Sequence, residues 1–251
     1  MMGTLGTALV AALLLPQQVD TTVAVREGTR LQVDLQHGAV TVGTWERDGV
    51  RVVYDERGGR PIEVRSADGA VVVRERVTQP GGNRDRRVGV TVPSWMPVRI
   101  STQHGDVRVD GTAAEVVVST VHGSIAVRGG RELVSATSVQ GSVIVDGARG
   151  RVEAESVNQG VRVEDVQGDV RVTAVNGGIV LQNVTGRTVS AETVNGGVQF
   201  TGPLLDGGHY RLASHNGSIV LTLPRSPSAR IDVATYNGEF VSDVPIQLSS
   251  V

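Results

Sequence analysis

The sequence contains no cysteine, and this absence removes several kinds of chemistry at once. Thiol catalysis, cysteine-ligated zinc and disulfide frameworks are all excluded. Lysine is absent as well, because all 24 basic residues are arginine. Without lysine the chain cannot form a Schiff base, and it lacks the phosphate-binding lysine of a P-loop.

Aromatic residues make up only 3% of the chain, and neither sign of charge dominates. The formal net charge is −2, and no basic stripe with interleaved aromatic residues is present. A nucleic-acid-binding protein would normally show such a stripe, so we do not expect nucleic acid as a partner.

Long apolar runs are missing except near the start of the chain. Residues 3–15 read GTLGTALVAALLL, which is too short to cross a bilayer as a helix. The length suits the hydrophobic region of a signal peptide, although no basic residue precedes the run and no A-x-A site follows it. We expect residues 1–18 to be a signal peptide with a truncated start, and the protein to be exported to the periplasm, cell surface or medium. The alternative is a buried N-terminal strand or helix.

Glycine, in contrast, is abundant, with 32 residues, and it recurs in a repeated word such as TQHG, TVHG, SVNQG or AVNG. The third residue of each word forms a column with steps of 18, 18, 18, 18, 19, 21 and 21 residues. The column consists of His104, His122, Gln140, Asn158, Asn176, Asn195, Asn216 and Asn237. The glycines of the words are Gly105, Gly123, Gly141, Gly160, Gly177, Gly196, Gly217 and Gly238. An outlying copy, LQHG, lies at 35–38.

Apolar residues alternate with polar ones between these words. Val107 and Val109 follow one word, and Val116 and Val118 come after a second turn in the same period. Alternation with a period of two indicates strands with one buried face. Each period therefore predicts two short strands.

Two all-β architectures fit this pattern: an antiparallel meander of hairpins, and a parallel β-solenoid. Equivalent residues of successive periods stack about 4.8 Å apart only in the solenoid. The column of amides and the adjacent glycines favour it, since stacked amides can hydrogen-bond and glycine can supply a positive φ at a corner. We predict about eight coils of 18–21 residues. Right-handed winding is preferred by the chirality of crossovers.

The flanking segments are less regular. Residues 19–99 still alternate, and they predict a β-rich segment that begins or caps the solenoid. Residues 100–251 predict the repeats followed by a C-terminal cap, because an open solenoid end exposes a strand edge.

The pattern resembles a bacterial family of β-strand-repeat proteins, DUF4097. The resemblance rests on VAVREGTRLQVDLQHGAVTV, on VTVPSWMPVRISTQHGDVRVDG and on the repeats ISTQHGDVRVDG and VSTVHGSIAVRG, and it covers residues 20–245. It implies an exported or envelope-associated, adhesin-like protein without assigned catalytic residues.

Several motifs could instead carry chemistry. The glycine words lack the following helix that a dinucleotide fingerprint needs, so we interpret them as corners. His104 and His122 could share a metal if they stack, but amides replace them in later words, so no metal site is predicted. An acidic cluster in two neighbouring coils could offer oxygen ligands to calcium. Its members are Glu153, Glu155, Glu164, Asp165 and Asp169.

No catalytic set is predicted, and no cofactor. Ser214 and His215 are adjacent on a strand and would point to opposite faces, which excludes a triad with Asp206. The leading hypothesis is a non-enzymatic envelope solenoid that binds or scaffolds, with an envelope glycan or a surface protein as partner. Its outward face would carry mixed charge, including Arg108, Arg128, Arg162 and Arg171. The alternatives are a carbohydrate-active lyase or hydrolase on the same fold, and a cytosolic scaffold that self-associates.

Overall fold

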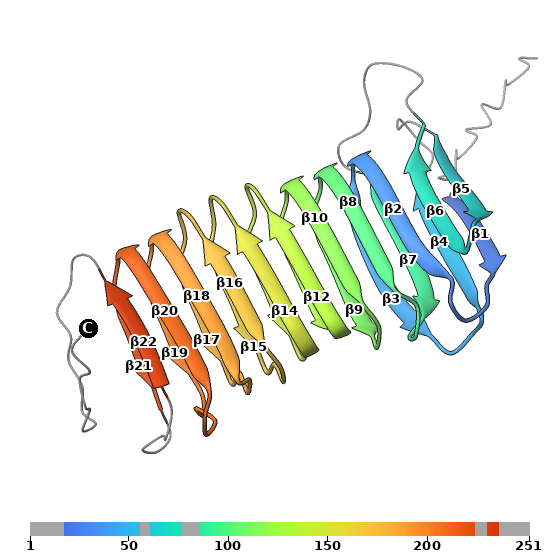
Figure 1. The fold of residues 1–251 in the computed structure, drawn as a ribbon. Coiled ribbons are helices and arrows are strands. Elements are labelled where there is room, and N and C mark those ends of the chain that lie inside the picture. The colour runs from blue at the N-terminus through green and yellow to red at the C-terminus, as the bar shows by residue number, and fades with distance from the viewer. Residues whose placement is uncertain (1–17, 56–60, 77–85, 224–229, 236–251) are drawn as a thin grey trace, which may run out of the picture.

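A computed structural model gives the fold, and it describes residues 18–55, 61–76, 86–223 and 230–235. Across these ranges the regular structure consists of strands alone, arranged in two sheets of 11 strands each (Figure 1). The strands of sheet A, in the order of their pairing, are β1 (Gln18–Ala24), β4 (Gly49–Asp55), β7 (Arg87–Pro93), β3 (Ala39–Trp45), β9 (Val107–Thr112), β11 (Ile125–Gly129), β13 (Val143–Asp146), β15 (Val161–Glu164), β17 (Ile179–Gln182), β19 (Val198–Thr201) and β21 (Ile219–Thr222). The strands of sheet B are β22 (Arg230–Thr235), β20 (His209–Asn216), β18 (Thr188–Asn195), β16 (Val170–Ala174), β14 (Arg149–Ser156), β12 (Arg131–Ser138), β10 (Val116–His122), β8 (Val98–His104), β2 (Arg30–His37), β6 (Ala70–Glu75) and β5 (Ile62–Ala67).

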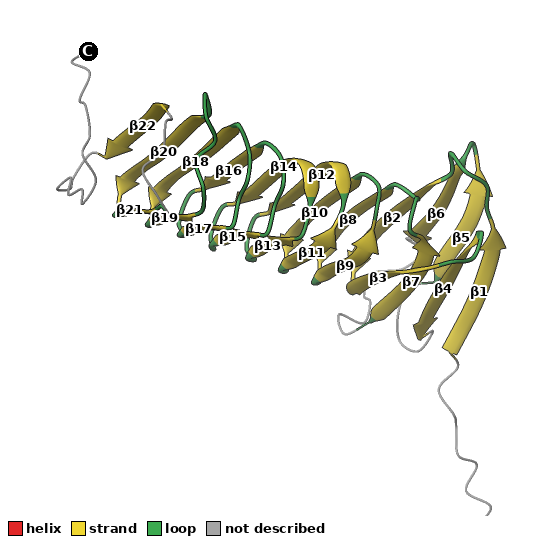
Figure 2. Ribbon diagram, turned by 90° about the horizontal axis from the view of Figure 1, so that it is seen from below, coloured by secondary structure: helices red, strands yellow, loops and turns green. Residues whose placement is uncertain are grey.

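The chain winds between the two sheets as a parallel β-solenoid, and the predicted all-β fold class is confirmed. From β8 to β21 each coil adds one strand to sheet B and one to sheet A, which gives seven successive coils. Figure 2 shows the two sheets as facing layers joined by corners. Every strand pair within these coils is parallel. The predicted signal peptide, residues 1–18, lies outside the described residues except for Gln18.

Valine fills the space between the layers. Val116, Val134 and Val152 pair in register on sheet B, and all three are fully buried. The facing strands of sheet A contribute similar stacks, such as Val143 and Val161. Because a β-branched side chain is stiff and packs well on a pleated surface, one small residue type can build a core that repeats from coil to coil.

The N-terminal segment departs from sequence order. The coil formed by β2 and β3 lies between the coil of β6 and β7 and the coil of β8 and β9. The inner coil, β2 with β3, therefore comes earlier in the chain than the coil outside it, β6 with β7. The outer strands β1, β4 and β5 pair antiparallel. Both sheets therefore run without interruption from this segment into the repeats.

A buried polar contact ties the inserted coil to its outer neighbour. The backbone N–H of Gln36 donates to Glu75 Oε2 at 2.9 Å. Glu75 Oε1 lies 4.0 Å from Arg86 Nη1, and both of these side chains are almost completely buried. The carboxylate thus joins β2 to β6 and to the segment that enters β7.

Candidate functional site

The corners between sheet B and sheet A carry the predicted column of polar side chains. Asn176 Nδ2 donates to Asn158 Oδ1 at 3.1 Å, and Asn195 Nδ2 donates to Asn176 Oδ1 at 2.9 Å. Asn216 extends this ladder with a bond of 2.9 Å to Asn195. The amides are exposed, so the ladder runs along one outer edge of the solenoid. Asn237 and Gly238, which belong to the last predicted word, lie outside the described residues.

Histidines continue the same column towards the N-terminal end. His37, from the inserted coil, pairs in register with His104, which pairs with His122. The ring centroids are 4.9 and 4.4 Å apart, with interplanar angles of 9° and 3°. Rings this parallel direct their nitrogen lone pairs side by side, so they do not converge on a shared ion. In the described part of the chain, no group of three or more metal-ligating side chains could hold a metal.

The glycines beside this column are needed mainly because the backbone of the neighbouring coil leaves no room for a Cβ, and less because of their own φ angles. Among the predicted glycines that the structure describes, only Gly105 and Gly123 have a φ in the left-handed range, 154° in each case. A Cβ on Gly141 would lie 1.8 Å from the carbonyl oxygen of Gly123. The expectation that these glycines supply a positive φ is therefore wrong for the later corners, where close backbone approach excludes a side chain.

One predicted glycine lies a position away from its expected column. The N–H of Val143 bonds to the carbonyl of Gly160, and the N–H of Val161 bonds to that of Gly178. Gly160 therefore aligns with Gly178, while Gln159 occupies the column of Gly141 and Gly177.

Small hydroxyl side chains fasten most of the corners from inside. Ser156 Oγ donates to the carbonyl of Gly141 at 2.9 Å and accepts from the N–H of Gln159 at 3.2 Å. Ser138 makes the same pair of bonds one coil earlier. The corresponding residue of the next coil is Ala174, which has no hydroxyl. These buried bonds join coil to coil where the backbone turns.

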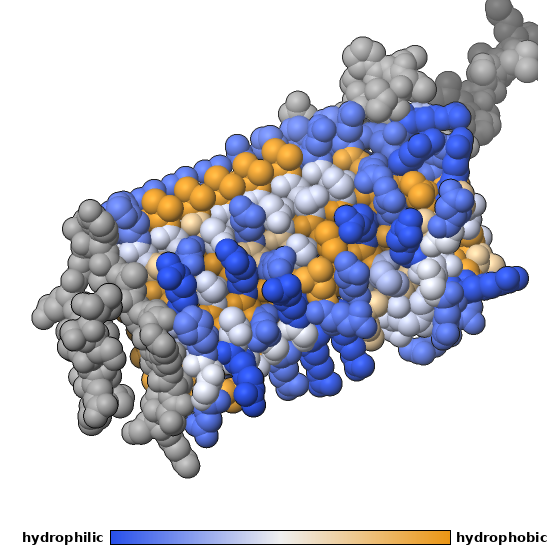
Figure 3. Space-filling model, viewed as in Figure 1, coloured by the Kyte–Doolittle hydropathy of each residue, from blue (hydrophilic) through white to orange (hydrophobic). Residues whose placement is uncertain are grey.

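A row of half-buried to exposed valines runs beside the amide ladder. It contains one valine from each of five successive corners, and Figure 3 shows it as an orange line along the upper edge of the molecule. Its members are Val121, Val139, Val157, Val175 and Val194. The two end members are 39% and 43% exposed. The edge thus offers an apolar line and a polar line side by side.

Most of the outward arginines singled out in the sequence are paired on sheet A. Arg108 Nε donates to Asp110 Oδ2 at 2.5 Å, and Arg162 Nη1 donates to Glu164 Oε1 at 3.1 Å. Arg128 lies 3.7 Å from Asp146. These are exposed pairs within or between adjacent strands, and each contributes little to stability.

The predicted acidic cluster is distributed over separate places. Glu153 lies 3.4 Å from Arg151 on sheet B, whereas Glu164 lies on sheet A. Asp165 Oδ1 accepts from Asn183 Nδ2 at 3.0 Å, and Asp169 Oδ1 accepts from the N–H of Thr188 at 3.1 Å. Glu155 faces outward on β14. Each of the carboxylates with a partner named above pairs with a side chain or backbone group of its own coil or of a neighbouring coil.

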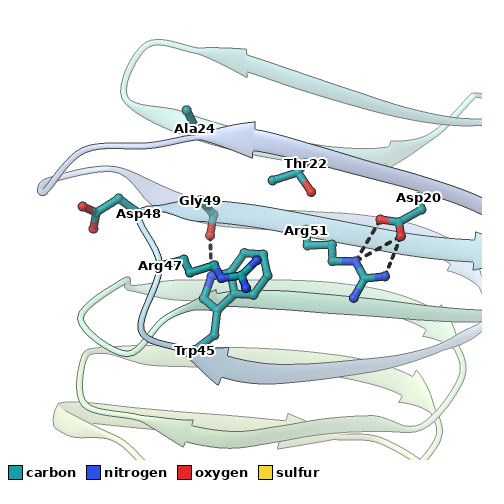
Figure 4. A pocket seen from close by; sticks show the side chains of 8 residues that line it. All are labelled: Asp20, Thr22, Ala24, Trp45, Arg47, Asp48, Gly49 and Arg51. Atoms are coloured by element: carbon teal, nitrogen blue, oxygen red, sulfur yellow. Dashed lines mark hydrogen bonds and ion pairs between the residues drawn. The ribbon is translucent and has the colours of Figure 1, made fainter.

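An open groove at the N-terminal end of sheet A was missed by the sequence analysis. Its volume is about 670 Å³, and its lining includes Asp20 and Thr22 from β1, Trp45 at the end of β3, Arg47, and Arg51 from β4 (Figure 4). These residues meet because β4, β7 and β3 pair out of sequence order. The only available signal was a tryptophan in a chain with few aromatic residues.

The two sides of this groove differ in chemistry. Trp45 Nε1 donates to the carbonyl of Gly49 at 2.8 Å, and the guanidinium of Arg47 lies 5.4 Å from the centre of the indole. At the other side, Arg51 Nε donates to Asp20 Oδ1 at 2.9 Å. This hydrogen bond lowers the pKa of the Asp20 carboxyl and raises the pKa of Arg51. The groove thus presents a flat ring opposite a paired carboxylate and guanidinium.

Comparison with known families decides the classification. The Toastrack DUF4097 family model matches residues 29–250. This chain belongs to the DUF4097 family. No curated protein sequence matches it.

Solved structures resemble this DUF4097 chain at low sequence identity. A putative adhesin from Parabacteroides merdae is 10% identical, with coverage of 87% of this chain and 93% of that one and a TM-score of 0.56. A putative adhesin from Parabacteroides distasonis is 11% identical over 88% and 96% of the two chains, with a TM-score of 0.48. The first likeness shows the shared fold.

The remaining residues weighed for catalysis have structural roles or lie apart in this DUF4097 protein. Ser214 is buried, and its Oγ donates to the carbonyl of Gly196 at 2.9 Å. His215 lies next to it on β20 and is exposed. A search of the described chain for an apolar helix long enough to cross a bilayer finds none.

Proposed function

We propose that this protein is an exported, non-enzymatic binding protein of the bacterial cell envelope, adhesin-like in its use of a rigid outer surface. The observation that carries the proposal is the recurrence of outward columns from coil to coil. The amide ladder joins Asn158, Asn176, Asn195 and Asn216 in four successive coils, and the valine row beside it spans five successive corners. A surface with this repeat suits an extended partner that lies along the solenoid.

Rigidity supports a binding role. Backbone hydrogen bonds in both sheets and hydroxyl bonds at the corners hold the backbone from which the outward side chains project. A preorganised surface loses less conformational entropy when a partner binds. The apolar run at residues 3–15 and membership of the DUF4097 family support export.

The test is expression of the full chain in a Gram-negative host, followed by fractionation and mapping of the mature N-terminus. We expect a shortened chain outside the cytoplasm, and retention of that chain on isolated cell-envelope material. A variant that lacks residues 1–18 is the control, and it should remain in the cytoplasm. An unprocessed cytoplasmic chain that does not bind envelope material would overturn the proposal.

A further inference from the structure

We propose that the groove at the N-terminal end of sheet A binds a neutral glycan, with the indole of Trp45 as the platform for one pyranose ring. The proposal rests on the binding function proposed above and gives that function a site and a ligand class. The groove volume of about 670 Å³ lies within the range of small-ligand sites, about 300–1,000 Å³.

The indole is held flat across the sheet. Trp45 lies at the end of β3 and bonds to Gly49 at the start of β4, and β7 lies between these two strands. The ring therefore spans the end of β7 instead of extending into the core. Trp95, the other tryptophan, packs against the core, whereas Trp45 does not. A ring fixed in this way offers its face to the solvent side.

The hydrogen-bonding capacity of Trp45 is already used within its own turn. Its single N–H donates to Gly49, so a ligand can use only the face of the ring. The apolar C–H face of a pyranose with equatorial hydroxyls is flat and matches such a surface. The hydroxyls at the rim of the sugar would then point to the polar side chains around the groove.

The charges around the groove favour a neutral ligand. Arg47 and Arg51 are balanced by Asp20 and Asp48, so the lining has no net charge. An anionic lipid headgroup or nucleotide would face two carboxylates. Sugar hydroxyls both donate and accept, and the ion pair of Asp20 with Arg51 offers free oxygen lone pairs and N–H groups to them.

The guanidinium of Arg47 can move off the indole face of Trp45 with only a small loss of free energy. Its guanidinium lies over the indole at 5.4 Å from the ring centre, and the side chain is exposed. An exposed cation–π contact is weak, so the guanidinium can move aside and hydrogen-bond a hydroxyl of the bound sugar. Arg47 would thus cover the ring in the free protein and contact the ligand in the complex.

Intrinsic fluorescence can test this site directly because the chain has two tryptophans. In a W95F background, Trp45 is the sole tryptophan, so selective excitation of tryptophan reports on it alone. We would titrate the full chain of this variant with cellotetraose and with chitotetraose. We expect a saturable change in Trp45 emission with at least one of them. Calorimetry on the otherwise unchanged chain provides a second measurement if W95F does not fold.

Two variants separate the roles of the groove residues. W45A should weaken binding of the same oligosaccharide at least about tenfold, and R47A should weaken it by a smaller factor. R128A, which removes an exposed arginine that lies outside the groove lining, on β11 two strands from β3, is the matched control and should bind as the wild type does. Unchanged melting temperatures would show that each variant is folded.

The outcomes distinguish this proposal from the broader one. If the exported protein binds envelope material and W45A binds it equally well, the glycan site is overturned while the binding function stands. Tighter binding of an anionic oligosaccharide, or saturable binding of a peptide alone, would also overturn it. If the wild-type chain is neither exported nor retained by envelope material, the binding function itself fails.

Discussion

At the scale of single residues, a corner side chain is constrained mainly by the coil beside it. Gly177 shows this clearly, because a Cβ there would lie 2.1 Å from the carbonyl oxygen of Gln159. Asn176, its sequence neighbour, points outward and meets only other amides. Adjacent residues of one repeated word therefore differ in how much they contribute to stability.

We expect Gly177→Ala to destabilise the protein by about 1–3 kcal/mol, because the backbone of the preceding coil at Gln159 must move to admit the methyl group. Asn176→Leu should cost less than about 1 kcal/mol, since its bonds are exposed. Gly43→Ala is the control, because no atom lies within 4 Å of the added Cβ. Urea unfolding measures all three, and equal effects for Gly177→Ala and Gly43→Ala would contradict the argument.

The buried hydroxyl column allows a paired experiment. Ser156→Ala should cost about 1–3 kcal/mol, because the carbonyl of Gly141 and the N–H of Gln159 lose a buried partner. Ala174→Ser inserts a hydroxyl at the corresponding place of the next coil, and it should stabilise by up to about 1 kcal/mol. Thermal unfolding of both variants would test this, and shifts of the same sign would argue against the proposed role.

At the scale of elements, the edge strands of the N-terminal end depend on exposed carboxylates. Asp20 on β1 is bonded to Arg51 on β4, and Glu63 on β5 is bonded to Arg74 on β6. The arginine hydrogen bonds lower the pKa of both carboxyls. Their stabilisation is therefore present at neutral pH and is lost as the pH falls through the lowered pKa values, below about pH 4.

We expect acid to loosen β1 and β5 before it affects the central coils. Hydrogen exchange followed by mass spectrometry at pH 7 and near pH 3, corrected for the intrinsic rate, would compare these strands with β14. In Asp20→Asn, β1 should exchange faster at pH 7 and should lose most of its further response to acid. Uniform loosening of all strands would show that these pairs do not determine the order.

At the scale of the whole molecule, stability should be close to a sum over coils and their interfaces. Residues 157–174 make up one coil, and their deletion joins Ser156 to Val175, which occupies the same column as Val157. We expect this variant to fold, with a modest decrease in melting temperature. Deletion of residues 157–165 removes half a coil and would place sheet A strands against sheet B, so it should not fold. Circular dichroism and melting distinguish these results, and equal loss of structure in both would contradict a modular solenoid.

The sequence predicted the repeating part of the fold because stacking makes identical demands on every coil. The spacing of 18 residues placed Asn158 correctly, but the glycine at position 160 misled the alignment, because Gln159 occupies the column that Gly141 and Gly177 fill in the neighbouring coils. The word LQHG at 35–38 was a true signal of the inserted coil. Its place between later coils could not be predicted, because out-of-order pairing leaves no local pattern.

The groove was beyond sequence reasoning for the same reason. Its residues come from β1, β3, β4 and the connection between β3 and β4, and they meet only through the order of strands in sheet A. Trp45 is not part of a repeat, so no regular spacing marks it in the sequence. Columns that recur are visible in a sequence, whereas a site that occurs once at the end of a stack has to be found in the structure.

The insertion of the β2–β3 coil has a consequence for a molecule held under tension between its two ends. At the C-terminal end, coils are added in sequence order, so a pulling force can peel them one after another, each releasing about 60 Å of extended chain. At the N-terminal end, peeling removes β1 and then reaches β2, which β6 and β8 hold from both sides. Force applied from that end is resisted at β2 once β1 has detached, so the remaining coils should yield from the C-terminus and the β2–β3 coil should stay folded longest.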